Sequence, residues 1–482
     1  MNVLFVVLAG LCAGANDAVV PETEVVENHR AAPPEVIFAE AIDLPEWMTS
    51  ELSTGATLYF SPQKGLRKAT IRVDVLQGHL DILPHSEANR SFHNSLLSRA
   101  TASYGAEELE LLSELHDLDI SAWHSYHQTG VQISVPNEDV SFGFDVLSSV
   151  LMEPSFPKKE IRLRRQELAR YYETNGPASP GSVASAALSF GWYDGAQPYG
   201  VRPDLDAMNT VKRSHLKKRH AQVLAQGTPQ FLVIGDMTEA EAKALCEPLV
   251  RRLEGQAPRK EPPVAVVPNK KQIFAVDMPD AKQAIIRFRM PAPRMDEADQ
   301  SAVSLANWVL GGHFMSRLNR NIREEKGLTY GVYSRYSSSP QVGHITARLD
   351  VAKDNAHLAV QEILSEFTRL GSEGLTALEL EDAQISKLTD WNTSLQSSYS
   401  TAGFFGTLVN NQWTVATAKS RMDAVQRLTL EDVNPALEQW FLPKDQWTLI
   451  LVGPRADLEA QFPADTFKIQ WVSPEDAILG SM

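Results

Sequence analysis

The fold of this chain is decided by the stretch Gly311-Gly312-His313-Phe314-Met315-Ser316-Arg317-Leu318, which continues through Ile322-Arg323-Glu324-Glu325-Lys326-Gly327-Leu328-Thr329-Tyr330. Apolar residues before this stretch recur at helical spacing, and the two glycines predict the end of that helix. A second helix is predicted from about Phe314 to Glu325, where Gly327 stops it, and a strand from Leu328 to Tyr336. Arg323 and Tyr330 should therefore lie near one turn, where a guanidinium and a phenol can converge.

The chain repeats itself at a distance of about 215 residues. An alternating strand at 131–135 precedes a helix with apolar residues at 140, 144, 147 and 151, and the strand at 347–351 precedes the same pattern, shifted by 216 residues. Two more strand pairs keep nearly this shift: 69–73 with 284–288, and 231–235 with 449–453. Three matched strands in the same order predict a duplicated unit.

Each copy mixes strands and helices without strict alternation of the two, which favours an α+β fold with a mainly antiparallel sheet. We expect one domain at 48–254 and a second at 273–482. The segment 255–272 between them begins with a Pro-rich, charged run and is expected to be a linker. Residues 16–47 are expected to form an irregular lead-in segment.

Composition and the N-terminus narrow the class of protein. The 482-residue chain is 43% hydrophobic and carries a net charge of −15, which argues against nucleic acid as a partner. Residues 1–15 hold an apolar run followed by small residues, as in a signal peptide, and predict export to the periplasm or cell exterior. No other apolar run has transmembrane length. After cleavage only Cys246 remains, so no intrachain disulfide is expected.

The residues Ser316-Arg317-Leu318, Arg323-Glu324 and Gly327-Leu328-Thr329-Tyr330, taken as a block, resemble the signature of pitrilysin/insulinase-type (inverzincin) metallopeptidases, in the group similar to the mitochondrial processing peptidase. The resemblance covers nearly the whole chain after the N-terminal segment. It implies two homologous halves, each a mainly antiparallel sheet with helices packed on one side. In heterodimeric members one subunit binds zinc and the other supplies the Arg and the Tyr, and this chain resembles the second kind.

The family's zinc motif, H-x-x-E-H, is absent from the sequence. The resemblance places Ser91 and Ser95 at the two ligand positions, Asn94 at the position of the general base, and Tyr171 about where the third ligand belongs. Arg164 falls where the family usually carries another Glu. A shift by two residues would bring in Glu173, but a lone carboxylate cannot replace the missing ligands. Neutral Ser and Asn side chains do not hold zinc, so no metal is expected in this chain.

The other histidines do not suggest a metal site either. His124 and His127 are separated by two residues in a strand-like run, so they should point to opposite faces and cannot chelate one ion together. His79, His85 and His93 lie close in sequence, but no carboxylate accompanies them at helical ligand spacing. They are expected to be surface or strand-edge residues.

By the resemblance, Tyr330 would donate a hydrogen bond to the oxyanion that forms during peptide hydrolysis, and Arg323 would hold a neighbouring peptide carbonyl. Gly311 and Gly312 would help to shape the peptide-binding cavity. A purely structural explanation is also open, because an Arg in a last helical turn favours the helix dipole and a Tyr at the start of a strand is common packing.

The first functional hypothesis is a non-zinc subunit of a heterodimeric zinc metallopeptidase. A homologous partner with H-x-x-E-H would supply the zinc, and an extended peptide would add to a sheet edge. Alone, the chain should be inactive. The second hypothesis is a catalytically inactive structural or peptide-binding protein on the same fold. A third is an enzyme with a displaced metal site.

Overall fold

The computed structural model describes residues 44–76, 86–124, 128–193, 199, 205–225, 228–253, 264–411, 413–442 and 444–479. These residues belong to one compact unit, Ile42–Met482. The expected signal segment 1–15, most of the lead-in at 16–47, the Pro-rich part of the expected linker, and His79, His85 and His127 lie outside the described residues.

The first sheet has six strands, with β3 near its middle. Its order is β1 (Met48–Glu51), β2 (Thr57–Pro62), β6 (Thr228–Gly235), β3 (Lys68–Leu76), β5 (Thr129–Pro136) and β4 (Asp119–His124). Neighbouring strands are antiparallel except β2 and β6, which are parallel.

The second sheet repeats this order. Its strands are β12 (Ile469–Val472), β7 (Gln272–Asp277), β11 (Thr448–Gly453), β8 (Gln283–Pro291), β10 (Gly343–Ala352) and β9 (Val332–Ser338). The pairs of β7 with β12 and with β11 are parallel, and the remaining pairs are antiparallel. The matched strands β3 and β8, β5 and β10, and β6 and β11 hold equivalent places, so the predicted duplication is confirmed.

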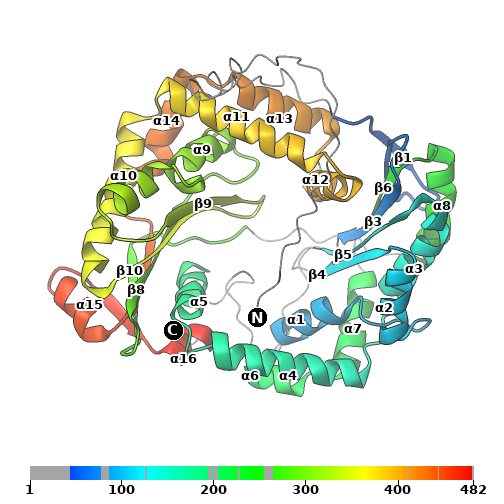
Figure 1. Cartoon of the computed structure of the whole chain (residues 1–482), viewed down its shortest axis with the longest axis horizontal. Helices are drawn as coiled ribbons and strands as arrows, with labels where there is room; N and C mark the ends of the chain where they lie inside the picture. The colour runs from blue at the N-terminus through cyan, green and yellow to red at the C-terminus, as the bar shows by residue number, and fades with distance from the viewer. Residues whose placement is uncertain are drawn as a thin grey trace, which may run out of the picture. The chain divides into compact units, whose positions relative to one another are not determined.

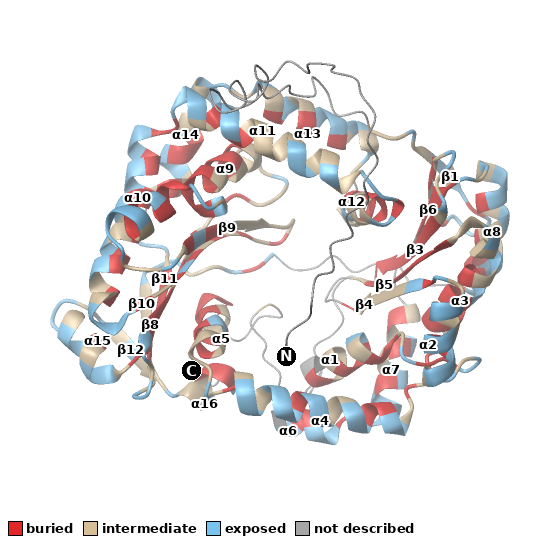
Figure 2. Ribbon diagram, in the orientation of Figure 1, coloured by how far each residue is buried: buried red, intermediate tan, exposed pale blue. Residues whose placement is uncertain are grey.

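One face of each sheet forms a main hydrophobic core. In the first sheet, Ile71 and Val73 of β3 pack under α3 (Val140–Met152) and α8 (Glu239–Arg252). In the second, Ile286 and Phe288 of β8 pack with α9 (Gln300–Asn307), α10 (Ala356–Glu373) and α14 (Leu430–Phe441). Figure 2 shows the buried residues gathered on the two sheets and on the helix faces beside them.

The other helices surround these layers. In the first half they are α1 (Ser86–Leu96), α2 (Ala106–Leu115), η2 (Asn137–Asp139), α4 (Lys158–Asn175), α5 (Pro180–Tyr193), α6 (Leu205–Thr210) and α7 (Arg213–Leu224). In the second they are η3 (Trp308–Gly312), η4 (Asn319–Glu325), η5 (Lys353–Asn355), α11 (Ala377–Ser394), α12 (Ser398–Asn410), α13 (Val415–Arg427), α15 (Arg455–Gln461) and α16 (Pro474–Leu479). None of the helices among the described residues has the length and apolar character needed to cross a bilayer.

The expected α+β class with two similar halves is confirmed, and the structure adds an exchange of helices between the halves. Helix α12 packs on the face of β3 and β6 that points away from the first core, where Leu232 contacts Phe405. Helix α5 packs in the same way on β7, β8 and β11, where its alanines meet Ile285 and Ile450. Figure 1 shows α12 and α5 across their sheets from α3 and α10 respectively.

The face of β3 under α12 is polar. Thr70 Oγ1 donates a hydrogen bond to Ser398 Oγ of α12 at 2.9 Å. Arg72 Nε lies 2.6 Å from an oxygen of Asp74, whose carboxylate is fully buried. A Cβ at Gly406 of α12 would lie 2.3 Å from Arg72 Cζ, so a larger residue there would have to displace the guanidinium. Burial raises the pKa of Asp74, and the Arg72 guanidinium opposes that rise.

Candidate functional site

The segment that carries Gly311, Arg323 and Tyr330 is built from two π-helical turns. Helix α9 passes directly into the π-helix η3, and a turn at 313–316 leads into the π-helix η4. Gly311 and Gly312 therefore belong to the last helical residues, and the second helix begins after Phe314, later than expected. Strand β9 starts at Val332 and not at Leu328, so Tyr330 precedes the strand.

Side-chain hydrogen bonds explain this late start of β9. Asn319, fully buried on η4, bonds to both backbone groups of Val332: its Nδ2 donates to the carbonyl at 2.8 Å, and its Oδ1 accepts from the N–H at 3.0 Å. Thr329 Oγ1 donates to the Asp350 carbonyl at 2.8 Å. Gly327, with φ +62°, ends η4 as expected. The loop before β9 is thus held by side chains instead of ladder hydrogen bonds.

A buried ion pair supports the start of the same segment. Arg317 is 9% exposed, and its Nε and Nη2 bond to the two oxygens of Glu379 at 2.7 and 2.6 Å. Arg317 Nη2 also donates to the Gly374 carbonyl at 2.9 Å. Hydrogen bonds from Arg317 and Thr376 outweigh the effect of burial and lower the pKa of Glu379 to about 2. Arg317, the first arginine of the matched block, thus has a structural role that the sequence did not reveal.

Arg323 and Tyr330 are placed differently from each other. The guanidinium of Arg323 lies over the Phe314 ring, 4.0 Å from its centre, and its nearest carboxylate oxygen, on Glu324, is 3.9 Å away. Its Nη1 is buried and has no hydrogen-bond partner among the described residues. Tyr330 is 95% exposed. Arg323 and Tyr330 lie in one segment, and within the described chain no hydrogen bond joins their side chains.

Gly311 and Gly312 lie in the wall of a cleft beside strand β9. A Cβ at Gly311 would stand 2.5 Å from the backbone nitrogen of Ser334, so glycine is needed for η3 to approach β9 this closely. The cleft has a volume of about 520 Å³. It is lined by Ser185, Leu188, Arg287, Arg289, Gly311, Gly312, Tyr333, Ser334, Arg335, Ser337, His344, Thr346 and Arg348.

The cleft is strongly basic. Arg287 is paired with Asp350 at 3.0 Å, and Arg289 donates to Thr346 Oγ1 at 2.8 Å, whereas Arg335 and Arg348 are exposed. Burial, together with Arg289 and Arg335, lowers the pKa of His344 to about 3, so this ring is neutral at pH 7. The cleft lining contains no carboxylate among the described residues. It therefore offers positive charge beside the edge strand of the second sheet.

The four arginines were not singled out from the sequence, although strand alternation contains a signal for them. Arg287 and Arg289 alternate along β8 with Ile286 and Phe288 of the core, so they had to emerge on the other face. The convergence of β8, β9 and β10 on one basic surface depends on strand order, which local patterning does not give.

The positions expected to match the family's zinc ligands hold no suitable donor set. On α1, Ser95 Oγ donates to the Ser91 carbonyl at 2.9 Å, and Asn94 Oδ1 accepts from the His124 N–H at 2.7 Å. Tyr171 on α4 is 56% exposed. The Ser95 and Asn94 side chains are engaged in these hydrogen bonds, and neutral Ser, Asn and Tyr groups do not fit a zinc ion. Among the described residues no three His, Cys, Asp or Glu side chains are grouped so as to hold a metal.

Arg164 and Glu173 also lie on α4, where sequence reasoning placed them. Arg164 Nη1 pairs with Glu167 at 3.2 Å, along its own helix. Glu173 is exposed near the end of α4. Neither brings a metal ligand to the Ser91 segment.

The expectation that His93 is a surface or strand-edge residue is wrong. His93 is fully buried on α1, and its Nε2 lies 3.1 Å from His220 Nδ1 of α7. The ring of buried His124, at the end of β4, is 4.6 Å from the His93 ring, and Arg219 Nε donates to His124 Nε2 at 2.8 Å. Burial is the main cause that lowers the pKa of all three rings, that of His220 to about 4. Sequence reasoning missed this cluster because α1, α7 and β4 meet only in the folded chain.

Comparison with known proteins identifies the family of this chain. Residues 63–187 match the model of the insulinase family, peptidase family M16, and residues 210–387 match that of the peptidase M16 inactive domain. The chain belongs to peptidase family M16. Its fold is that of the M16 peptidases.

Relatives in the M16 family carry two kinds of name. An uncharacterized zinc protease of Mycobacterium leprae, ML0855, is 23% identical over 81% of this chain and 88% of its own. A protein of Helicobacter pylori named as a non-peptidase homolog, YmxG, is 29% identical over 37% of this chain and 41% of its own.

Solved structures agree on the M16 fold. The peptidase M16 inactive domain from Pseudomonas fluorescens superposes with a TM-score of 0.74 at 21% identity, covering 85% of this chain and 98% of that chain. The periplasmic protease PqqL from Escherichia coli superposes with a TM-score of 0.66 at 17% identity. The match covers 92% of this chain but only 50% of PqqL, so about half of the PqqL chain lies outside the match.

Proposed function

We propose that this chain is the non-zinc subunit of a heterodimeric M16 metallopeptidase and supplies Arg323 and Tyr330 to a peptide held at its partner's zinc site. The observation that carries the proposal is the 95% exposure of Tyr330 on a segment fixed by Asn319 and Thr329. A tyrosine retained for packing would be buried, and this one is not. Its phenol is therefore available to a ligand that comes from outside the chain.

Arg323 supports the same role. Its guanidinium rests on Phe314, and its Nη1 has no acceptor among the described residues. A buried donor without an acceptor costs about 1–3 kcal/mol, and a bound peptide carbonyl would remove that cost. The ring contact limits the rotamers of the side chain, so less conformational entropy is lost when it binds.

These two side chains suit the charge that develops in peptide hydrolysis. When the scissile carbonyl is attacked, its oxygen becomes negative, and a phenol O–H and a guanidinium N–H stabilise it by donating hydrogen bonds. Loss of one such donor typically lowers the rate by about 10²–10³-fold. This chain has no metal donor set at its own Ser91 segment, so the proposal assigns zinc, water and general base to the partner.

The basic cleft and the PqqL comparison support a peptide ligand and a second unit. Strand β9 is the edge of its sheet among the described strands, and an extended peptide can add to such an edge by main-chain hydrogen bonds. Arg335 and Arg348 would favour acidic side chains in that peptide. Because PqqL has about twice the matched length, a homologous H-x-x-E-H chain is the partner that we propose here.

Export of the chain is part of the proposal. The apolar run within residues 1–15 supports a signal peptide. The related PqqL is named a periplasmic protease, which agrees with a periplasmic or extracellular location.

The test measures hydrolysis of a mixed set of unstructured peptides by this chain alone, by an H-x-x-E-H M16 partner alone, and by both together. We expect chelator-sensitive activity to rise only in the mixture. Tyr330→Phe should lower that activity by about 10²-fold or more without changing the melting temperature. Tyr171→Phe, which removes another exposed phenol, serves as the control. Full turnover with Tyr330→Phe would refute the catalytic role of Tyr330.

A second candidate function, a catalytically inactive structural or peptide-binding protein, is favoured by the substituted zinc positions and by the name of the Helicobacter pylori relative. The same mixing experiment separates the two. Peptide binding by this chain with no complex and no gain in turnover would favour this second function.

A further inference from the structure

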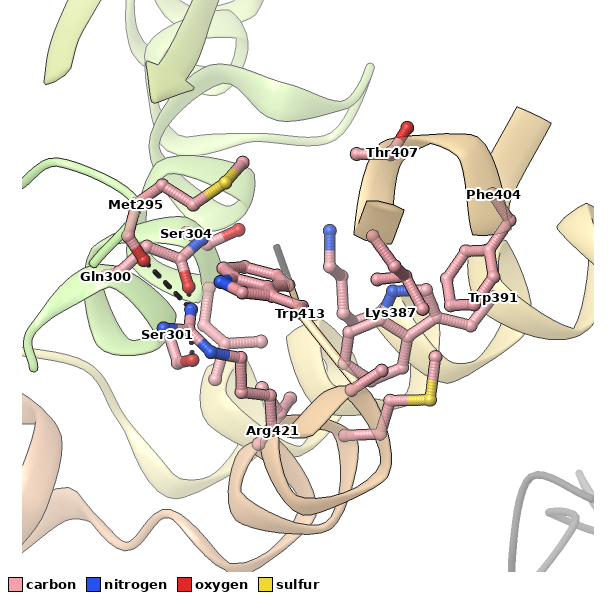
Figure 3. Close-up of a pocket in the computed structure, with 15 residues that line it drawn as sticks. Met295, Gln300, Ser301, Ser304, Lys387, Trp391, Phe404, Thr407, Trp413 and Arg421 are labelled. Carbon is pink, nitrogen blue, oxygen red and sulfur yellow. Dashed lines mark hydrogen bonds between the residues drawn. The ribbon is translucent and has the colours of Figure 1, made fainter. Parts of the chain in front are cut away.

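A cavity of about 290 Å³ lies in the second half, away from the basic cleft, and neither the resemblance nor the proposed function uses it. It lies between α9, α11, α12 and α13. Its lining consists of Met295, Gln300, Ser301, Ser304, Leu305, Lys387, Trp391, Phe404, Thr407, Leu408, Trp413, Ala418, Arg421, Met422 and Val425. Figure 3 shows Lys387 and Arg421 among the aromatic side chains that line it.

The walls of the cavity are mainly apolar, with three aromatic rings. Trp391 and Phe404 come from α11 and α12, and Trp413 comes from the turn between α12 and α13. Four short polar side chains, three from α9 and one from α12, complete the wall. Flat rings with a few polar groups are the usual lining of a small-molecule site, and the volume is near the lower end of such sites, about 300 Å³.

The cavity also holds two cations and, among its described lining residues, no acid. The Lys387 ammonium lies 5.6 Å from the Trp391 ring centre, and in the described chain it has neither a hydrogen bond nor a carboxylate within ion-pair distance. Burial lowers the pKa of Lys387, and the more distant Asp390 only partly opposes this shift. An ammonium in an apolar cavity without a counter-ion is costly to the folded chain.

Arg421 of α13 presents the second cation. Its guanidinium stacks on Trp413, 3.9 Å from the ring centre, and its Nη1 donates to the Met295 carbonyl at 2.9 Å. No carboxylate among the described residues pairs with Arg421. The nearby Asp296 pairs with Arg294 instead, at 3.6 Å. The stacking on Trp413 and the bond to Met295 hold the guanidinium in one orientation while leaving other N–H donors for an anion.

We propose that this cavity binds a small carboxylate with an apolar, preferably aromatic, tail. The carboxylate would lie between Lys387 and Arg421, and the tail would lie between Trp391, Phe404 and Trp413. A carboxylate suits both cations, since it can accept hydrogen bonds from the guanidinium and supplies the counter-charge that the ammonium lacks. The tail replaces water next to the aromatic walls.

Two sources share this chemistry: a free organic acid and the C-terminal residue of a short peptide. Their common feature is a carboxylate next to an apolar group, and the experiment below distinguishes the two sources. Binding in this cavity involves neither Arg323, Tyr330 nor a partner subunit. A failure to bind would therefore leave the proposed peptidase role unaffected, and the reverse also holds.

The experiment measures binding to the full chain at pH 7 by calorimetry, with quenching of tryptophan fluorescence as a second readout. The probes are 3-phenylpropionate, its uncharged amide, and N-acetylphenylalanine as a peptide-end mimic. We expect saturable binding of at least one carboxylate and at least tenfold weaker binding of the amide. Tighter binding of N-acetylphenylalanine assigns the site to peptide ends, and tighter binding of 3-phenylpropionate assigns it to free acids.

Lys387→Met keeps most of the side-chain volume and removes the charge. We expect it to weaken carboxylate binding at least tenfold and to leave the melting temperature unchanged or higher, because it removes an unpaired half-buried charge. Lys419→Met on α13, where the lysine is exposed, is the matched control and should bind as the unmodified chain does. Equal binding of acid and amide, unchanged binding by Lys387→Met, or no saturable binding of either carboxylate would overturn the proposal.

Discussion

The Arg323 guanidinium on η4 lies over the ring of Phe314, which belongs to the turn between the two π-helices, 4.0 Å from the ring centre. Arg323 belongs to the block that resembles the M16 signature, and Phe314 lies two residues before that block and is 51% exposed. The ring holds the guanidinium in place while its Nη1 lacks an acceptor in the described chain. Phe314 is thus a positioning residue for Arg323 in the proposed peptide site.

Phe314→Ala should weaken the assembled peptidase without unfolding this subunit. A cation–π contact at a partly exposed site is worth about 0.5–1 kcal/mol, so we expect a two- to fivefold loss of kcat/KM in the complex. Met315→Ala is the matched control, since Met315 is 52% exposed beside Phe314. A loss of the same size in both variants would mean that Phe314 acts only as exposed apolar surface.

The neighbouring glycines should respond very differently to the same substitution. In Gly311→Ala the new Cβ meets Ser334 at 2.5 Å, whereas in Gly312→Ala its nearest contacts are at 3.4 Å. We expect Gly311→Ala to destabilise the chain by about 1–3 kcal/mol and Gly312→Ala to change stability by less than about 0.5 kcal/mol. Thermal melting of the two variants checks this, and equal melting temperatures would show that η3 can move away from β9 at little cost.

The basic cleft should select peptides by charge. Replacing Arg335 and Arg348 together by Gln should lower the affinity for acidic extended peptides several-fold at low salt and leave basic peptides unaffected. The difference should shrink at about 1 M salt, where the screening length falls to about 3 Å. Arg162→Gln on the exposed face of α4 is the control. Unchanged binding of acidic peptides would place the peptide elsewhere.

The buried histidines should make the chain sensitive to mild acid. Burial lowers the pKa of His220 to about 4 from 6.5, so the folded chain takes up this proton less readily than the unfolded chain. Stability from this group is full above about pH 6.5 and is lost as the pH falls towards 4, on the order of 3 kcal/mol in all. His93 and His124 shift in the same direction, and Arg219 opposes a charge on either ring.

Melting temperatures between pH 4 and pH 7.5 test this. His220→Gln should be less stable at pH 7 but should show a shallower decline in acid. His215→Asn, on the exposed side of the same helix, should keep the slope of the unmodified chain. If His220→Gln keeps that slope as well, other groups govern the acid response.

Sequence patterning was sufficient for the fold because the decisive signals are local and occur twice. The alternating strand at β5 and the helix face of α3 recur at β10 and α10, and a repeated pattern fixes the order of elements in both halves. The π-helical turns were not predictable in this way. They depend on Asn319 reaching Val332 and on Gly311 meeting Ser334, and both contacts join residues that local periodicity does not connect.

The candidate site was predictable only in part for the same reason. The matched block located Arg323, Tyr330 and the two glycines, which lie in one segment. It gave no information on what surrounds them, such as the bond between Arg317 and Glu379 or the arginines of β8 and β10. Those neighbours come from strands and helices up to 62 residues away in sequence.

The exchange of α5 and α12 affects the order in which the chain can be completed during synthesis. When the first sheet leaves the ribosome, the buried pair of Arg72 and Asp74 has no cover, because α12 lies more than 300 residues downstream, as the 328-residue separation of Thr70 and Ser398 shows. The first half must therefore wait, with a charged surface open to solvent, until most of the second half has been made. A chain cut between the halves would yield two fragments, each missing one helix, that become complete only by finding each other.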